Sequence, residues 1–144
     1  MHAHEQQTDG VALTPRLPDW LARRANTNPD CLALIARNGR WTFAELDRWV
    51  TVVARRLARL GVQPGNLVAV LLRNVPEFVA LVHAMPRTGA ILVPLNTRLA
   101  APELAWQINP VGARLLLHDT HHTPLAEAVR QHVPDLSVVH VEHL

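Results

Sequence analysis

The chain has 144 residues, of which 49% are hydrophobic, and a formal net charge of +2 with its histidines neutral. This length predicts one domain or a part of a larger one, and the hydrophobic content is sufficient for a packed core. All 14 basic residues are arginines, and the lack of lysine excludes a Schiff base, a P-loop lysine and a lysine general base.

The N-terminal region is predicted to hold a tail and a short helix. Residues 1–16 are expected to form a flexible tail, because chain termini fray unless they dock. Residues 17–25 place Trp20, Leu21 and Arg24 at helical spacing, which favours a short helix. The chain has no long apolar segment, so neither a secretory signal nor a membrane-spanning helix is expected.

A β-hairpin is predicted next. The apolar run at residues 31–36 and the segment at residues 41–43 are its two strands. Asn38 and Gly39 lie between them, and the Asn-Gly pair favours a type I′ turn.

The following helix has the clearest start and stop signals. Thr42 and Glu45 form a capping box, and Trp41 and Leu46 have the spacing of a hydrophobic staple. Gly61 is placed to end the helix. An apolar stripe with helical period predicts its core face: Leu46, Trp49, Val50, Val53, Leu57 and Leu60. The arginines of this helix mostly lie off that stripe: Arg48, Arg55, Arg56 and Arg59.

Beyond Gly61, apolar runs alternate with helical patterns. The predicted strands are residues 67–72, 90–95, 115–117 and 136–141. The predicted helices start at Asn74, at Ala101 and at Pro124, and the last of them ends at His132. This alternation predicts an α/β fold with a mainly parallel sheet and flanking helices.

Side chains that could carry chemistry form no complete catalytic set. The six glycines form neither a dinucleotide nor a P-loop motif. The densest polar group is His118, Asp119, His121 and His122. A metal site is one interpretation of this group, because imidazole and carboxylate suit zinc or iron, and a solvated polar loop is the favoured one.

Three further residues have both a catalytic and a structural interpretation. Ser137 lies in the last predicted strand, outside any nucleophile elbow. Cys31 is predicted to be an inert core residue rather than a nucleophile. His83 is predicted to be a partly buried helix residue without an orienting carboxylate, rather than a general base. A single cysteine forms no internal disulfide, which fits a cytoplasmic protein.

Two motifs occur in a fixed order. Residues 41–46 read WTFAEL, and residues 89–96 read GAILVPLN. Together with the segment at residues 97–119, they resemble core motifs of the adenylate-forming enzymes. These include acyl- and aryl-CoA synthetases, luciferases and peptide-synthetase adenylation domains. The resemblance runs from about Leu17 to Asp119 and looks nearest to the acyl-CoA ligase branch.

This resemblance implies that residues 17–144 are an incomplete N-terminal α/β subdomain of an ATP-dependent acyl- or aryl-CoA ligase. Such an enzyme uses ATP, Mg and CoA to turn a small-molecule carboxylate into an acyl-adenylate and then into a CoA thioester. The family's Pro-Lys phosphate loop and its catalytic lysine are not in this lysine-free chain, so the chain alone is expected to be inactive. The alternatives are a non-catalytic CoA- or partner-binding module and an unrelated α/β domain of similar architecture.

Arg98 is the one site residue that the resemblance suggests. The resemblance implies that Arg98 lies near the CoA phosphates, where a planar guanidinium offers a fork of donors to phosphate oxygens. The alternative is a solvated arginine at the start of a helix. No catalytic residue, metal ligand or firmly bound cofactor is assigned to the fragment itself.

Two further expectations concern partners. The arginines are scattered and aromatic residues are few, so nucleic-acid binding is not expected. An unfinished sheet would expose apolar surface, which predicts self-association.

Pro86 departs from the family's pattern. A proline inside a helix removes the hydrogen bond to the carbonyl four residues back, here that of Val82, and costs about 3 kcal/mol. The helix is therefore predicted to kink or end near Met85.

Overall fold

The computed structural model describes residues 18–144, so the tail predicted at residues 1–16 lies outside the described part of the chain. None of the described helices has the length and apolar character needed to cross a membrane. The elements in chain order are α1 (Trp20–Thr27), β1 (Leu32–Ala36), β2 (Gly39–Thr42), α2 (Phe43–Arg59), β3 (Leu67–Leu71), α3 (Pro76–Thr88), β4 (Ile91–Pro94), α4 (Ala101–Val111), β5 (Leu115–His118), η1 (Thr120–His122), α5 (Thr123–His132), β6 (Ser137–His140) and η2 (Val141–His143).

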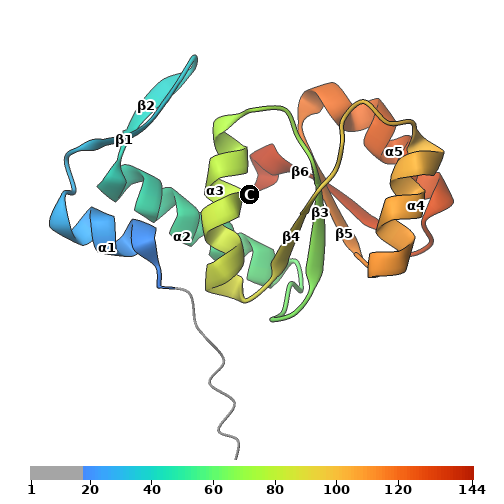
Figure 1. Cartoon of the computed structure of the whole chain (residues 1–144), viewed down its shortest axis with the longest axis horizontal. Helices are drawn as coiled ribbons and strands as arrows, with labels where there is room; N and C mark the ends of the chain where they lie inside the picture. The colour runs from blue at the N-terminus through green and yellow to red at the C-terminus, as the bar shows by residue number, and fades with distance from the viewer. Residues whose placement is uncertain (1–17) are drawn as a thin grey trace, which may run out of the picture.

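The centre of the fold is a four-stranded sheet in the order β4-β3-β5-β6 (Figure 1). All of its neighbouring strands are parallel, and Val68 of β3 lies opposite Leu92 of β4 and Leu115 of β5. A helix follows each of the strands β3, β4 and β5 and carries the chain back to the start of the next strand. The predicted α/β class with a parallel sheet is confirmed.

Strand β3 is buried on both faces, which explains its unbroken apolar sequence. Val68 and Val70 belong to one hydrophobic core, which α2 and α3 complete. Ala69 and Leu71 belong to a second core, which α4 and α5 complete on the other side of the sheet (Figure 1). Strand β5 is buried in the same alternating way.

Helix α2 starts and ends where its sequence predicts. The Thr42 hydroxyl accepts a hydrogen bond from the Glu45 backbone N–H at 3.3 Å, and the Glu45 carboxylate accepts one from the Thr42 N–H at 2.8 Å. Gly61 follows the helix with a φ of 87°. The buried face consists of Leu46, Val50, Val53 and Leu57. Leu60, predicted to extend this face, is instead 46% exposed.

The hairpin forms, but its turn differs from the prediction. Strands β1 and β2 pair with Ala36 opposite Gly39, so the loop residues are Arg37 and Asn38. Neither Asn38 nor Gly39 has a positive φ, and the predicted type I′ turn is therefore wrong. The glycine serves packing instead, because a Cβ at Gly39 would come within 2.8 Å of the Trp41 ring.

Helix α3 continues through Pro86 to Thr88, so the predicted end near Met85 is wrong. The missing N–H of Pro86 falls in the last turn, where other donors close the helix. The Thr88 hydroxyl donates to the Met85 carbonyl at 2.9 Å, and the Ala90 N–H donates to the same oxygen at 3.1 Å. Gly89 then reverses the chain with a φ of 72°.

Arg87 ties three helices together, and its side chain is only 16% exposed. Its Nε donates to Asp19, the N-cap of α1, at 2.8 Å. Its Nη2 donates to Asp47 at 2.5 Å and its Nη1 to the Thr51 hydroxyl at 2.8 Å, both in α2. Burial by itself lowers the pKa of Arg87, but the hydrogen bonds to the two carboxylates raise it above its usual value. The guanidinium therefore remains charged.

We expect Arg87→Ala to lower the free energy of unfolding by about 2 kcal/mol, because the partly buried Asp47 and Thr51 lose their donor. Urea denaturation followed by circular dichroism measures this loss. Arg130→Ala is the matched control. It removes an exposed 2.8 Å ion pair with Glu127 and should cost at most about 0.5 kcal/mol. Equal losses in the two variants would show that Arg87 is not a structural clamp.

Candidate functional site

The sheet has a topological switch point between β3 and β5. The chain leaves β3 toward β4 on one side, and it leaves β5 toward β6 on the other. Ligands of α/β sheets bind in the crevice outside the carboxyl ends of two such strands. The candidate site is therefore the edge where β3 ends at Leu71 and β5 ends at His118.

A crevice of about 340 Å³ opens at this carboxyl edge. Its walls are the loop of the β1–β2 hairpin, the segment from β3 into α3, the start of η1 and the end of β6. Its ionisable lining residues are Arg37, Arg73, Glu77, Asp119, His140 and Glu142. Acidic and basic side chains are mixed, so the crevice offers both hydrogen-bond donors and acceptors, and its electrostatic potential is not of a single sign.

Asp119 connects the ends of the two central strands. Its Oδ2 accepts hydrogen bonds from the backbone N–H of Arg73 at 3.0 Å and from Arg73 Nε at 3.3 Å. Its Oδ1 accepts from the backbone N–H of His122 at 3.0 Å and lies 2.7 Å from His122 Nδ1. Burial by itself raises the pKa of Asp119, but these hydrogen bonds lower it to about 2. Since an ionised carboxylate only accepts, Nδ1 of His122 carries the proton.

The segment around Asp119 is not the solvated loop that its polar sequence predicts. His118 is 4% exposed, and Asp119 and His122 are each 6% exposed. His118 is the last residue of β5, and its Nδ1 lies 2.9 Å from the Asp119 carbonyl. The prediction failed because α5 packs against β5 and η1, and His140 of β6 pairs with His118. Among residues 18–144, no three His, Cys, Asp or Glu side chains are arranged to hold a metal ion.

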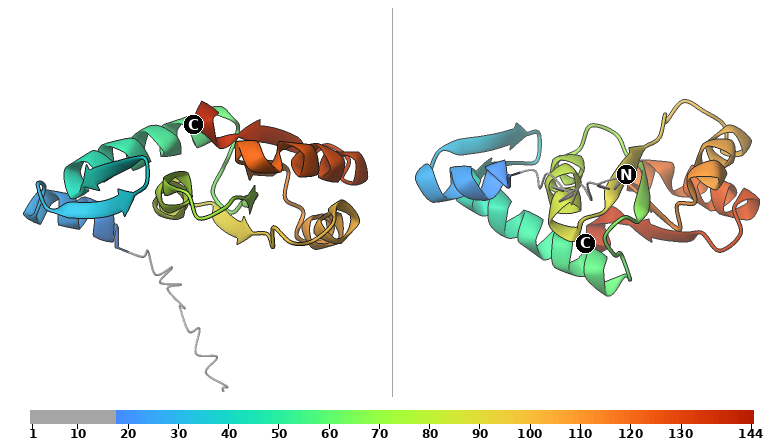
Figure 2. Two further views of the ribbon diagram at one scale, coloured as in Figure 1. Left: turned by 90° about the horizontal axis from the view of Figure 1, so that it is seen from above. Right: turned by 60° about the horizontal axis from the view of Figure 1, so that its bottom comes forward.

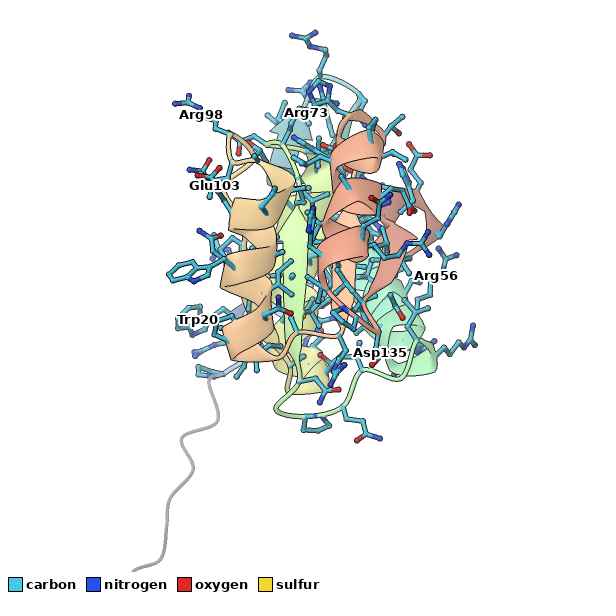
Figure 3. The ribbon with its side chains drawn as sticks, turned by 90° about the vertical axis from the view of Figure 1, so that its right-hand side faces the viewer. Trp20, Arg56, Arg73, Arg98, Glu103 and Asp135 are labelled. Carbon is cyan, nitrogen blue, oxygen red and sulfur yellow. The ribbon has the colours of Figure 1, made fainter. Side chains whose placement is uncertain are left out.

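Arg98 lies in the turn that follows β4, at the same edge of the sheet. Its backbone N–H donates to Asn96 Oδ1 at 3.0 Å, which stabilises the turn, and its side chain is exposed. Figure 3 shows Arg98 and Arg73 projecting from the same end of the molecule. Within residues 18–144, no carboxylate forms an ion pair with Arg98. Its guanidinium is therefore available to an external anion.

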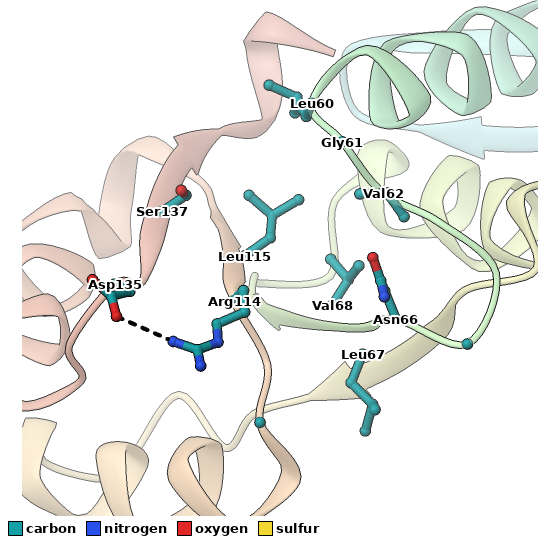
Figure 4. A pocket seen from close by; sticks show the side chains of 12 residues that line it. Leu60, Gly61, Val62, Asn66, Leu67, Val68, Arg114, Leu115, Asp135 and Ser137 are labelled. Carbon is teal, nitrogen blue, oxygen red and sulfur yellow. Dashed lines mark hydrogen bonds and ion pairs between the residues drawn. The ribbon is translucent and has the colours of Figure 1, made fainter.

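A larger cavity, of about 580 Å³, lies at the opposite, amino edge of the sheet (Figure 4). Turn residues and an exposed ion pair line it, with Arg114 Nη1 at 3.4 Å from Asp135. Ser137, at the start of β6, also lines it, but the lining contains no histidine that could act as a base. This cavity is wide and lacks catalytic groups.

Two other candidates are placed by the structure. Cys31 is exposed just before β1, so its predicted burial is wrong. The hairpin turns Leu32 and Ile35 outward, with exposed fractions of 50% and 61%, whereas Ala33 and Leu34 pack against the core that α2 and α3 complete, so the apolar run is buried on one face only. His83 is half-buried in α3, as predicted. Burial lowers its pKa, although the nearby Asp19 opposes this, so a carboxylate that the sequence did not indicate does lie near it.

Comparison with known proteins assigns the chain to a family. Residues 21–144 match the AMP-binding enzyme family. The chain belongs to this family. The suspected membership among the adenylate-forming enzymes is thereby confirmed.

Curated relatives of this chain are CoA ligases. The 2-succinylbenzoate–CoA ligase of Geobacillus kaustophilus is 41% identical over 103 residues, which are 72% of this chain and 21% of that enzyme. The corresponding ligase of Bacillus cytotoxicus is 40% identical over 108 residues, which are 75% of this chain and 22% of that enzyme. The chain thus spans about a fifth of the length of these relatives.

Solved structures agree with this assignment. The o-succinylbenzoate CoA synthetase of Bacillus subtilis, in complex with its acyl-adenylate intermediate, has a TM-score of 0.80 and 33% identity. The match covers 88% of this chain and 25% of that one. The inhibitor-bound N-terminal domain of FACL13 from Mycobacterium tuberculosis has a TM-score of 0.77 and 30% identity, over 85% of this chain and 32% of that one. The fold is the N-terminal part of an adenylate-forming enzyme.

Sequence reasoning missed the contact between Arg73 and Asp119, which are 46 residues apart. One signal was present, because Arg73 directly follows the predicted strand at residues 67–72 and Asp119 lies two residues after the one predicted at residues 115–117. In a parallel sheet all strands end on the same side, so this placement alone could have suggested that the two residues meet. It could not show that neighbouring elements bury the carboxylate.

We expect Asp119→Asn to lower the free energy of unfolding by about 2 kcal/mol at pH 7. Folding lowers the pKa of Asp119 from its usual 3.8 to about 2. The ionised carboxylate therefore adds to the free energy of unfolding above pH 3.8, and this contribution is lost as the pH falls toward about 2. Denaturant unfolding from pH 7 to pH 2.5 should therefore show a shallower acid decline in the variant. Asp135→Asn, which removes the exposed pair with Arg114, is the control and should keep the wild-type profile. Identical profiles for all three proteins would contradict this role of Asp119.

Proposed function

We propose that this chain is the N-terminal part of an ATP-dependent carboxylate–CoA ligase. The supporting observation is the match of residues 21–144 to the AMP-binding family, together with a TM-score of 0.80 to a CoA synthetase that holds an acyl-adenylate. The proposed reaction joins a carboxylate to the AMP moiety of ATP and then transfers the acyl group to the CoA thiol. A cytoplasmic location is part of this proposal.

Within this reaction the chain's own contribution is binding and positioning. Arg98 is proposed to contact phosphate oxygens of CoA, since its guanidinium is exposed at the carboxyl edge and has no ion-pair partner within residues 18–144. Arg73 is held at the same edge by Asp119. Adenylate formation also needs cationic stabilisation of the reacting phosphate groups, and the phosphate-loop lysine and catalytic lysine of the family are not in this chain, which contains no lysine.

The unfinished surface of the sheet supports the same proposal. Ile91 on the outer strand β4 is 51% exposed, and Trp106 on α4 is 75% exposed. Apolar side chains in such positions are typical of surfaces that another part of a protein covers. In the isolated chain, these surfaces are proposed to cause self-association.

The isolated 144-residue chain should not catalyse the reaction. With ATP, Mg²⁺, CoA and 2-succinylbenzoate as the first acid to test, we expect no acyl-adenylate and no acyl-CoA above background. Chromatography with mass detection measures both products. A product that forms in proportion to the added chain would overturn the expected inactivity and leave the family assignment intact.

A second candidate function is CoA binding without turnover, which the exposed Arg98 favours. Calorimetric titration of the chain with CoA should show binding that Arg98→Gln weakens by about tenfold, as expected for the loss of charge-assisted hydrogen bonds. Arg130→Gln removes a comparable exposed charge on α5 and should leave the affinity unchanged. Absent heat, or equal affinities for all three proteins, would rule out Arg98 as a CoA contact in this chain.

A further inference from the structure

Four arginines occupy one face of α2, and we refer to them as the α2 arginine face. They are Arg48, Arg55, Arg56 and Arg59, and all four are exposed. At 100° and 1.5 Å per residue, they fall within an arc of about 100° and span about 17 Å of the helix. The buried residues of α2 lie on the opposite side, so core packing cannot account for this face.

These arginines have no ion-pair partner within residues 18–144. Helix α2 carries two carboxylates, and both already accept other donors: Glu45 accepts the Thr42 N–H, and Asp47 accepts Arg87 Nη2. Arg56 and Arg59 lie in the last turn, where a positive charge stabilises the helix dipole. Arg48 and Arg55 lie outside that turn, so the dipole does not explain the face as a whole.

The face is open to a large partner. Both views of Figure 2 show α2 along the outside of the molecule, and Figure 3 shows Arg56 pointing away from the fold. Val52 lies among the arginines and is 41% exposed. The face therefore combines four charged side chains with one exposed apolar side chain on the convex surface of a helix. The aromatic residue next to this face, Trp49, packs against the core, so no exposed residue of the face is aromatic.

We propose that the α2 arginine face binds the surface of a membrane that carries anionic phospholipids. A flat surface of phosphate groups can contact all four guanidinium groups at once, and each guanidinium can bond two phosphate oxygens. Val52 can enter the headgroup layer between them. A single-stranded nucleic-acid site would instead favour aromatic side chains for base stacking, which the exposed part of this face lacks. A duplex offers phosphates but no apolar layer for Val52, and the test below separates it from a membrane surface. The association is peripheral and electrostatic.

The strength of this association follows from its electrostatic origin. A basic side chain near an anionic membrane contributes about a fivefold gain in partitioning, so the four together contribute several hundredfold. The attraction extends over about 10 Å at 0.1 M salt and shortens at higher salt. Binding should therefore be clear at low salt and weak above about 0.3 M.

Cosedimentation of the 144-residue chain with vesicles tests the proposal. The vesicles contain either phosphatidylcholine alone or phosphatidylcholine with phosphatidylserine. The wild-type chain should bind only the vesicles with phosphatidylserine. The variant R48Q/R55Q/R56Q/R59Q should lose binding by at least a hundredfold. The control R23Q/R40Q/R114Q/R130Q removes four exposed arginines elsewhere and should retain most of the binding.

Several results would overturn the proposal. They are no binding by the wild-type chain, equal binding to both kinds of vesicle, and equal losses in the α2 variant and the control. Tighter binding of the wild-type chain to a short DNA duplex than to the anionic vesicles would assign the face to nucleic acid instead. Thermal unfolding of each variant shows that it is folded, and glutamine at exposed helix positions should change stability little.

Discussion

Strand β3 lies between two hydrophobic cores, and the rest of the fold is arranged around its burial on both faces. A strand in that position needs helices on both sides, which α2 and α3 supply on one face and α4 and α5 on the other. Its hydrogen-bonding edges need neighbours as well, which are β4 and β5. The parallel strands and the return helices follow from these needs, because parallel neighbours require a long crossover.

Burial of the central strands also determines the chemistry of the carboxyl edge. Polar residues enter where β3 and β5 end, and Asp119 is there nearly excluded from water. A buried carboxylate is tolerated only with sufficient donors, and Arg73 and His122 supply them from two different elements. The carboxylate thereby holds the loop after β3 in place, beside the crevice that the switch point creates.

The outer parts of the fold have a different character. Strand β4 leaves one edge of the sheet without a partner strand among residues 18–144, and the β1–β2 hairpin exposes Leu32 and Ile35. The chain spans about a fifth of its CoA ligase relatives, and open apolar surfaces fit a unit that belongs to a larger assembly. The outer face of α2 is charged instead, so it is suited to a polar partner rather than to burial in a core.

The sequence by itself determined the features that depend on neighbouring residues. The capping box of Thr42 and Glu45, the stop at Gly61 and the strand–helix alternation were all readable, because their interactions span only a few residues. The same local motifs carried the family resemblance. Only the tertiary structure decided that Cys31 is exposed, that the segment around Asp119 is buried and that α3 continues through Pro86. Each of these depends on which distant elements cover a residue or complete its hydrogen bonds, and a local pattern contains no information about that.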